Sequence, residues 1–433
     1  MRWPVLDILP SLLQNVHRVH EWTVDISSMV GSTIVGRGPI FGRSEMLFTC
    51  DPRNVEYMVR TNFSNYPKGS EFLETFDLIG EGIFNIDFEA WHAQRRMAHT
   101  LFTSKEFRSY ISSVNRNLVQ YSLLPLLANS SNNSSVLDFE DVFLRYAFDS
   151  IFTVIFGKSS NCLALNAPTN AFSNAIDDGT EAMFFRNVIP SPLWKVLRFL
   201  KLGTERKLAE AQKTIDSHLK EYISVKKDEL SKGIEGKDLL AAYMKIQAEK
   251  EELANKGDKF LRDTSLSFLF AGRDSSGTSL TWFFWLLSKS PRVEEIIMEE
   301  LRSVYLKKNT NSENSHNKVK GHWVFDADDL KGLVYLHAAL SEALRLYPPL
   351  PMNRKISLKE DILPDGTVMK PGPRTCIGKD MAFTQMKLAA AAVLFNFQVE
   401  LVEGQVVLPK PSLVLHTRNG LLVRVKERQN LYS

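Results

Sequence analysis

The sequence predicts a mainly helical fold with a small β region, and three observations carry this prediction. Long stretches place apolar residues at helical spacing or consist of strong helix formers, with clusters of Pro, Gly and Asn between them. The composition, with 44% hydrophobic and 24% charged residues, is close to the globular average and excludes disordered, collagenous and coiled-coil classes. No internal repeat and no linker rich in Pro, Gly or Ser divides the chain, so we expect one large domain over residues 1–433.

The expected elements follow from the N-terminus onward. Residues 1–60 mix short apolar runs with turn residues, which predicts a β-rich part before a helix that begins near Asp51. Two polar stretches, Ala128 to Ser135 and Lys307 to His322, predict surface loops. Near the end, the alternation of apolar residues around Asn419-Gly420 predicts a β-hairpin. Helices are predicted over Trp91 to Phe102, Ser104 to Leu127, Val136 to Ile155, Thr204 to Glu229 and Asp238 to Asn255.

Charge and cysteine content exclude several classes of protein. Lys+Arg 53 against Asp+Glu 50 give a net charge of +3, which is too balanced for general nucleic-acid binding. Cys50, Cys162 and Cys376 form no C-x-x-C pair, which argues against a disulfide scaffold and a Cys-rich zinc site and favours a reducing compartment. The best apolar candidate, Leu266 to Leu287, is interrupted by two charged residues, so we expect no membrane-spanning helix.

Two Gly-rich segments are poor nucleotide-binding motifs. Residues 372–380 have five residues between the glycines rather than four, and Asp380 replaces the Ser or Thr that binds magnesium in a phosphate loop. The segment that begins at Gly80 offers Asn85 in place of the third glycine of a dinucleotide fingerprint, so we expect only a turn there.

Two helical segments carry unusual polar groups. The W-x-x-x-R spacing of Trp91 and Arg95 puts an aromatic ring and a cation on one helix face, which suits an anionic carboxylate or an ordinary amphipathic surface helix. The segment LSFLFAGRDSSGTSLTWFFWLL is apolar almost all round except near Arg273 and Asp274, and a charged pair inside a core helix needs partners, water or a ligand. Ala271-Gly272 removes bulk beside that pair, so a flat group could approach the backbone there. The alternative is a kinked core helix with a satisfied polar bridge.

Two further segments follow. The E-x-x-R spacing of Glu342 and Arg345 places an ion pair on one face before Pro348 ends the helix, a common surface feature when it stands alone. The Gly-rich loop 372–378 leads into a long apolar helix, so the thiolate of Cys376 would lie near a helix N-terminus, where metal ligation is favoured. A buried structural cysteine is the alternative.

In this order, the four elements resemble the signature set of the cytochrome P-450 superfamily of haem-thiolate monooxygenases. NYPKGSEF, AGRDSSGTSLTWFFWLLSK and EALRLYPPLP are further similar to the plant subgroup that hydroxylates long-chain fatty acids and alkanes for cutin, suberin and wax. The matches are Gly372, Arg374, Cys376 and Gly378 in the F-x-x-G-x-R-x-C-x-G loop, AGRDSS in the A-G-x-D/E-T stretch, Glu342 and Arg345 in E-x-x-R, and Trp91 and Arg95 in W-x-x-x-R.

The resemblance implies haem b as cofactor and Cys376 as the thiolate ligand of its iron. Arg374, Trp91 and Arg95 would hold the haem propionates, and Arg354 or Lys355 would add another contact. The resemblance also implies an oxygen pocket on the distal helix, lined by Ala271, Gly272, Asp274 and Ser275. Asp274 and Ser275 would relay protons there through water. The family's structural ion pair would be Glu342 and Arg345.

The family's partners and location follow from the same resemblance. Electrons would come from NADPH through a separate reductase, because the chain has no flavin or nicotinamide motif of its own. Molecular oxygen and a long-chain aliphatic compound would be the substrates, and Phe72 to Phe88 and Met183 to Leu200 would cover the pocket or belong to the ordinary core. We expect the protein at the cytosolic face of the endoplasmic reticulum membrane, associated with the membrane surface. Because the anchor is not present, a soluble chain is the alternative. We expect no nucleic-acid partner.

The match also has departures. Ser275 replaces the usual Thr, and Met369 replaces the Phe of the cysteine loop. Residues near 370–373 join GTVMKPG directly to PRTCIG, so we expect a fold that is incomplete between the E-x-x-R helix and the cysteine loop. This gap would leave Glu342 and Arg345 without the third member of an ion network. The alternative function is therefore a truncated, inactive family member that does not retain haem.

Overall fold

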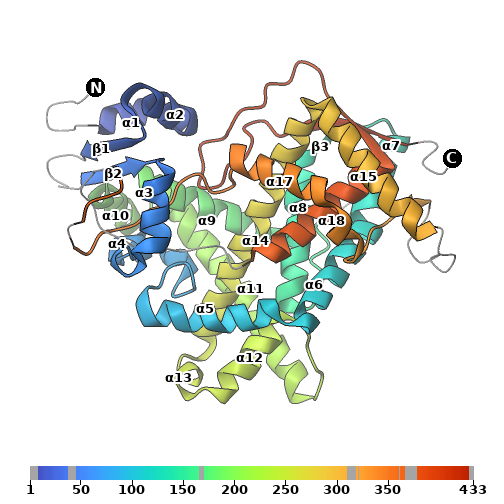
Figure 1. The fold of residues 1–433 in the computed structure, drawn as a ribbon. Helices are drawn as coiled ribbons and strands as arrows, with labels where there is room; N and C mark the ends of the chain where they lie inside the picture. Colours follow the sequence, from blue (N-terminus) through green and yellow to red (C-terminus); the bar gives the residue numbers. More distant parts are fainter. Residues whose placement is uncertain are drawn as a thin grey trace.

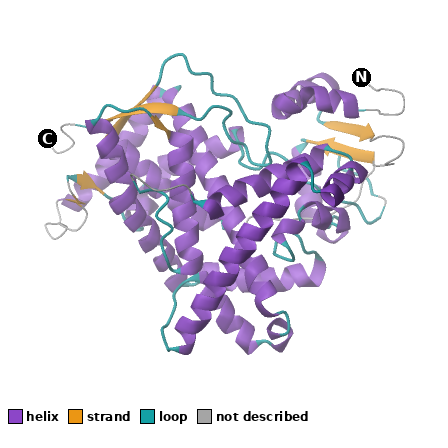
Figure 2. Ribbon diagram, turned by 180° about the vertical axis from the view of Figure 1, so that it is seen from behind, coloured by secondary structure: helices purple, strands orange, loops and turns teal. Residues whose placement is uncertain are grey.

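The computed structural model describes residues 8–37, 45–164, 170–309, 318–319, 321–359, 361–365 and 378–428. Helices make up most of this part, and the few short strands lie in small sheets (Figure 2). The mainly helical prediction with a small β region is confirmed. None of the helices in these ranges combines the length and the apolar character that crossing a lipid bilayer requires.

The N-terminal part begins with helices rather than strands. Residues 9–30 are helical because Pro10 stands at the start of the first helix and the apolar residues that follow have helical spacing. The expected β-rich start is therefore found only after Gly31, in one antiparallel pair. The elements are α1 (Leu9–Asn15), η1 (Val16–Arg18), α2 (Val19–Val30), β1 (Thr33–Arg37) and β2 (Glu45–Thr49).

A run of helices follows. The side chain of Asp51 accepts a hydrogen bond from the backbone N–H of Arg53 and begins α3, as predicted. The predicted helix over 104–127 is interrupted by a π-helical turn just before Pro125, which has no N–H to donate. The elements are α3 (Pro52–Glu56), η2 (Tyr57–Thr61), η3 (Phe63–Asn65), α4 (Ser70–Thr75), η4 (Asp77–Ile79), α5 (Phe88–Thr103), α6 (Lys105–Leu118), η5 (Val119–Leu123), α7 (Leu124–Asn132), β3 (Leu137–Asp138) and α8 (Phe139–Phe156).

The predicted loop at 128–135 is shorter than expected. Residues 128–132 continue α7, because the Ser130 side chain is buried and its hydroxyl lies 2.9 Å from that of Ser135. The second predicted loop also begins inside a helix, since α15 continues to Asn309, and its residues 310–317 lie outside the described ranges.

The rest of the fold surrounds one long helix. Figure 1 shows α14 running through the middle of the molecule, where it packs most extensively against α8 and also against α17 and α18. The α8 contact is close because Gly277 has no side chain: a Cβ there would lie 3.1 Å from the backbone of Leu144. These elements are α9 (Ala171–Val188), α10 (Ser191–Leu200), α11 (Gly203–Ser231), α12 (Leu239–Glu249), α13 (Glu251–Ala254), α14 (Gly257–Ser288), α15 (Pro291–Asn309), β4 (Lys318–Val319), β5 (His322–Trp323), α16 (Asp329–Gly332), α17 (Val334–Leu346), α18 (Lys379–Asn396), β6 (Phe397–Leu401) and β7 (Leu422–Glu427).

The predicted hairpin at Asn419-Gly420 is wrong. β7 pairs with β6 and β3, not with the residues just before the turn. Gly420 has a φ of +75°, and the next backbone N–H, that of Leu421, donates to Asp138 at 2.9 Å. The Asn-Gly pair therefore carries the chain past the N-terminus of α8 and does not fold it back on itself.

Candidate active site

The middle of α14 holds the acid and the hydroxyl that the sequence singled out. Ser275 Oγ donates a hydrogen bond to the carbonyl of Ala271 at 2.5 Å, which is the back-bond expected of a hydroxyl in a helix. Asp274 is 2% exposed, whereas Ser275 and Ala271 are partly exposed. The carboxylate of Asp274 therefore lies in buried surroundings, whereas the hydroxyl of Ser275, one residue on in the same turn, is partly exposed.

The charge of Arg273 has a partner on another helix. Its guanidinium donates to both carboxylate oxygens of Asp177 in α9, at 2.5 and 3.0 Å, and its Nη1 lies 3.4 Å from Asp274 Oδ1. Burial works against the guanidinium charge, but the carboxylates of Asp274 and Asp177 outweigh it, so the pKa of Arg273 lies above its usual range. The charged pair inside the apolar helix is thus compensated by an ion pair to α9, one of the alternatives that the sequence left open.

Gly272 packs closely against α8. A Cβ at Gly272 would lie 2.5 Å from Ile151 Cγ1, so α8 already fills the space that the missing side chain leaves. Gly272 lets two helices pack closely, and the approach of a flat group to its backbone remains a prediction. Gly272 is itself partly exposed, as are Ala271 and Ser275.

The W-x-x-x-R pair of α5 does share one face. The guanidinium carbon of Arg95 lies 5.8 Å from the ring centroid of Trp91, within range of a cation–π contact. Trp91 is buried and also contacts the ring of Phe63, with centroids 5.0 Å apart. The cation is therefore positioned by an aromatic pair.

Arg354 and Lys355 lie in a segment that runs beside residues 65–71. Arg354 Nη2 donates to Glu71 Oε2 at 2.5 Å, and Lys355 Nζ donates to the carbonyl of Tyr66 at 2.7 Å. Both cations contact groups of the segment that leads toward α5, and the proposed contact with a haem propionate remains a prediction.

The E-x-x-R pair lies on the surface. Arg345 and Glu342 form two hydrogen bonds, and Pro348 follows the end of α17, as predicted. Their side chains are 67% and 55% exposed, so the two charges pair in contact with solvent.

The cysteine loop falls almost entirely outside the described residues. Cys376, Arg374 and Gly372 lie in the undescribed range 366–377, and so does Met369. Gly378 is the residue before the first turn of α18, and its carbonyl accepts from the N–H of Ala382 at 2.9 Å. Within the described ranges, no group of three or more His, Cys, Asp or Glu side chains could hold a metal ion.

The exposure of α14 tests whether these residues suit a haem. Ala271 and Ser275 are partly exposed in the middle of α14, between the buried stretches 263–269 and 276–284, and both have short side chains. At the start of α18, which packs against α14, Met381, Ala382 and Phe383 are also only partly buried. A flat, mainly apolar group fits such surroundings, and a contact of Arg95 with an acidic substituent of that group remains a prediction.

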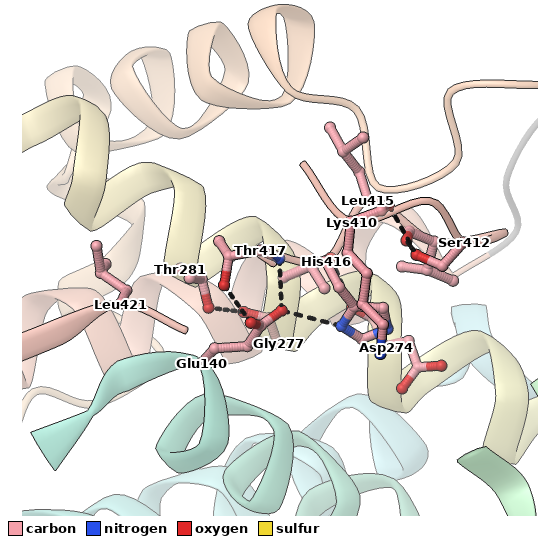
Figure 3. A network of polar contacts seen from close by, with 12 residues as sticks. Glu140, Asp274, Gly277, Thr281, Lys410, Ser412, Leu415, His416, Thr417 and Leu421 are labelled. Carbon is pink, nitrogen blue, oxygen red and sulfur yellow. Dashed lines mark hydrogen bonds and ion pairs between the residues drawn. The ribbon is translucent and has the colours of Figure 1, made fainter. Parts of the chain in front are cut away.

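The structure adds two residues that sequence reasoning missed. Glu140, in the first turn of α8, accepts a hydrogen bond from the backbone N–H of Thr417 and lies 3.0 Å from His416 Nδ1. Both side chains belong to the polar network that Figure 3 draws. They also line a cavity of about 740 Å³, as does Asp274. The only signal in the sequence is a histidine within an apolar run, which does not indicate a partner 276 residues away.

A buried central helix that carries an acid beside a hydroxyl, followed by a helix that a cysteine loop leads into, is the arrangement of a haem-thiolate oxygenase. The family model of cytochrome P450 matches residues 40–372 and 371–424, which together cover most of the chain. The chain therefore belongs to the cytochrome P450 family, whose members are monooxygenases. The match is interrupted at residues 371–372, where the family fold is incomplete between α17 and the cysteine loop.

Individual relatives agree with this assignment. Cytochrome P450 86B1 of Arabidopsis thaliana is 38% identical over 484 positions, covering 98% of this chain and 85% of the relative. Alkane hydroxylase MAH1 of Arabidopsis thaliana is 34% identical, covering 98% and 93%. Noroxomaritidine synthase of Narcissus aff. pseudonarcissus MK-2014 is 31% identical, covering 98% and 91%. The alignment with the first is longer than this whole chain, so that relative carries segments that this chain lacks.

Proposed function

We propose that this chain is a monooxygenase that hydroxylates long-chain aliphatic substrates, either fatty acids or alkanes. The observation that carries the proposal is the buried carboxylate of Asp274 beside the half-exposed hydroxyl of Ser275, in the middle of α14 of a P450 chain. A haem held by Cys376 would supply the activation of molecular oxygen, with electrons delivered from NADPH by a reductase.

The chain's own residues would bind and orient the cofactor and the proton. Trp91 and Arg95 would hold a propionate, joined by Arg374 and by Arg354 or Lys355. Ser275 Oγ donates a hydrogen bond to the carbonyl of Ala271. It would accept a proton from a water molecule while it releases its own proton toward the open face of α14. Asp274 would supply the proton that this water molecule gives to Ser275.

The apolar segments that we assign to the pocket support an aliphatic substrate. Leu78 packs against the bare backbone of Gly179 in α9, because a Cβ there would lie 2.5 Å from Leu78 Cδ2. Phe72 and Phe76 stack with their centroids 4.3 Å apart. The segment 72–88 thus meets α9 at Gly179 through an apolar side chain, which suits an alkyl chain. The name of the Arabidopsis alkane hydroxylase agrees with this substrate class.

The surface of α10 supports membrane-surface association. Its exposed face carries large apolar side chains, with Phe199 85% exposed, next to basic residues. An amphipathic helix of this kind lies in the interface of a membrane. In Figure 1, α10 lies on the same side of the molecule as α1 and α2, and Val19 of α2 packs against Phe184 and Val188 of α9. We therefore propose the cytosolic face of the endoplasmic reticulum membrane, where a reductase would be reached.

The interruption at residues 371–372 favours a second candidate, an inactive family member that does not retain haem. The two candidates differ in whether the purified chain carries haem. Retained haem excludes the second candidate before any turnover is measured.

The experiment that tests the proposal compares Ser275→Ala with Ser275→Thr in membranes that contain an NADPH-dependent reductase. Hexadecanoic acid and hexadecane are the substrates, and hydroxylated product is measured per NADPH consumed. We expect Ser275→Ala to lower this ratio and to raise hydrogen peroxide release, whereas Ser275→Thr keeps the hydroxyl and the ratio. Equal ratios in all three proteins, or no product from either substrate with haem bound, would contradict the proposal.

A further inference from the structure

A cavity of about 740 Å³ lies on the side of α14 that carries Asp274. It is walled by α8, α9, α14 and the loop before β7, and Asp177, which is 54% exposed, stands at its solvent side. The space is many times that of a single water molecule, so it has room for a chain of water molecules between the solvent side and the wall that Asp274 lines.

His416 enters this cavity from the loop before β7. Its Nδ1 lies 3.0 Å from Glu140 Oε1, so the Nδ1 proton is donated to that carboxylate. Its Nε2 has no hydrogen-bond partner in the part of the chain that the structure describes, and the ring is 15% exposed. The exchangeable proton of the imidazolium is therefore on the side of the ring that does not contact Glu140.

Glu140 holds the ring in this orientation. Its Oε1 also accepts the backbone N–H of Thr417 at 2.9 Å, and its Oε2 accepts the Thr417 hydroxyl. Glu140 lies in the first turn of α8, where the positive end of the helix dipole stabilises a carboxylate. The histidine is thus anchored through one nitrogen and free at the other.

The acid across the cavity has a carboxylate oxygen without a hydrogen bond. Asp274 Oδ1 is buried without a hydrogen bond to any described residue, and its contact with Arg273 Nη1 is 3.4 Å, too long for one. Arg273 donates its close hydrogen bonds to Asp177 instead. Figure 3 draws His416 between Glu140 and Asp274.

The charges around His416 favour the imidazolium. Burial lowers its pKa, but the hydrogen bond to Glu140 and the charges of Asp274 and Glu140 outweigh burial and the opposing charge of Arg273, so the pKa of His416 lies above 6.5. The carboxylates around the ring therefore favour its protonated form. The charged groups that line the cavity are Asp138, Glu140, Asp141 and Arg145 around α8, Asp177, Asp178 and Glu181 on α9, Arg273 and Asp274 on α14, and Lys410 in the loop.

We infer that His416, held by Glu140, is a positioning residue that keeps a proton ready for Asp274 through water in this cavity. The inference rests on the proposed function, because it adds the preceding step to the role of Asp274. His416 Nε2 gives its proton to a water molecule, and that water gives one of its own protons to an Asp274 oxygen. The imidazole becomes neutral, Asp274 becomes a carboxylic acid, and the solvent side of the cavity returns a proton to Nε2.

The first test measures the coupling between the two groups and needs no turnover. The ring of His416 is titrated by NMR in the intact protein with labelled histidine, and the signal is assigned through its loss in His416→Gln. In Asp274→Asn, which removes one negative charge across the cavity, we expect the pKa of His416 to move downward. An unchanged titration would overturn the inference, and this holds whether or not the chain hydroxylates anything.

The second test separates a proton relay from an anchor. His416→Gln keeps a donor for Glu140 but holds no titrating proton, whereas Thr417→Val removes one hydrogen bond to the same carboxylate and leaves the imidazole. We expect the product formed per NADPH to fall about tenfold in His416→Gln only. In the wild type this ratio should decline as the pH rises through the pKa of His416, and the decline should vanish in His416→Gln.

Equal losses in the two variants, with parallel pH profiles, would mean that the contact only anchors the loop and would overturn the inference. Absence of product from all variants, the wild type included, would contradict the proposed function and leaves the NMR titration to decide the coupling.

Discussion

Arg345 donates two hydrogen bonds to Glu342, of 2.8 and 2.7 Å, and both side chains are more than half exposed. The pair lies on the last turn of α17, three residues apart, where water screens it. The two charges therefore compensate each other, and the pair does not need a third charged partner in the described part of the chain.

Replacing Arg345 by Ala should consequently leave the thermal midpoint of unfolding almost unchanged, because exposed ion pairs stabilise little. Glu342→Ala should behave alike, and the two can be compared by differential scanning calorimetry. A marked fall in either variant would show that the pair belongs to a buried network after all.

The ion pairs of Arg186 should behave in the opposite way. Its side chain is only 2% exposed and donates to Glu205 twice and to Asp77 once, each at 2.7 Å. Arg186→Leu would leave the buried carboxylate of Glu205 without its partner and should cost about 3–5 kcal/mol in the free energy of unfolding.

Arg206→Ala is the matched control in the same region. Arg206 pairs with Glu210 on the surface of α11, with both side chains well exposed. Urea titrations of the two variants should separate them clearly, and similar losses would refute the distinction between buried and exposed pairs.

The close contact between α8 and α14 predicts that one added methyl group lowers the free energy of unfolding. In Gly277→Ala the new Cβ would lie 2.9 Å from Leu144 Cδ2 and 3.1 Å from its backbone, so the helices must separate. Overpacking of this kind should lower the free energy of unfolding by about 1–3 kcal/mol despite the better helix propensity of Ala.

Gly332→Ala in α16 is its control, because the new Cβ would meet only Val304 Cγ2 at an ordinary 3.6 Å. This variant should be neutral or slightly stabilised in the same denaturation experiment. A stabilised Gly277→Ala would contradict the described packing of α14.

His20 predicts how stability changes with pH. Burial lowers its pKa below 6.5, its Nε2 lies 3.2 Å from the Ser412 carbonyl, and its Nδ1 is buried without a partner among the described residues. Between 6.5 and the lowered pKa, the unfolded chain binds a proton that the folded chain does not. Stability should therefore fall as the pH drops below 6.5 and level off beneath the folded pKa.

His20→Gln removes the titrating group, so the difference in unfolding free energy between this variant and the wild type should change with pH only in that window. Denaturation curves from pH 8 to pH 5 measure it. A constant difference would contradict the burial of a neutral His20.

The sequence predicted those parts that depend on local pattern. The apolar run around AGRDSS became α14, and the i,i+4 spacing of Trp91 and Arg95 became a cation–π pair, because helix periodicity alone decides which side chains share a face. Pro348 ended α17 for an equally local reason.

What the sequence did not predict depends on partners far along the chain. A side chain at Gly272 would collide with Ile151, and one at Gly420 would collide with Asp138. His416 and Glu140 meet only in the folded molecule. The cysteine loop, with Cys376, remains a prediction from the family motif, because it lies outside the described residues.

The measurement that tests the account most directly is a carbon-monoxide difference spectrum of the reduced chain, expressed with an ample haem supply. We expect haem to copurify and the Soret band to show the red shift of a thiolate ligand, and Cys376→Ala to abolish that shift. Haem that is not retained, or an unshifted band in the wild type, would contradict the assignment of Cys376 and with it the proposed monooxygenase.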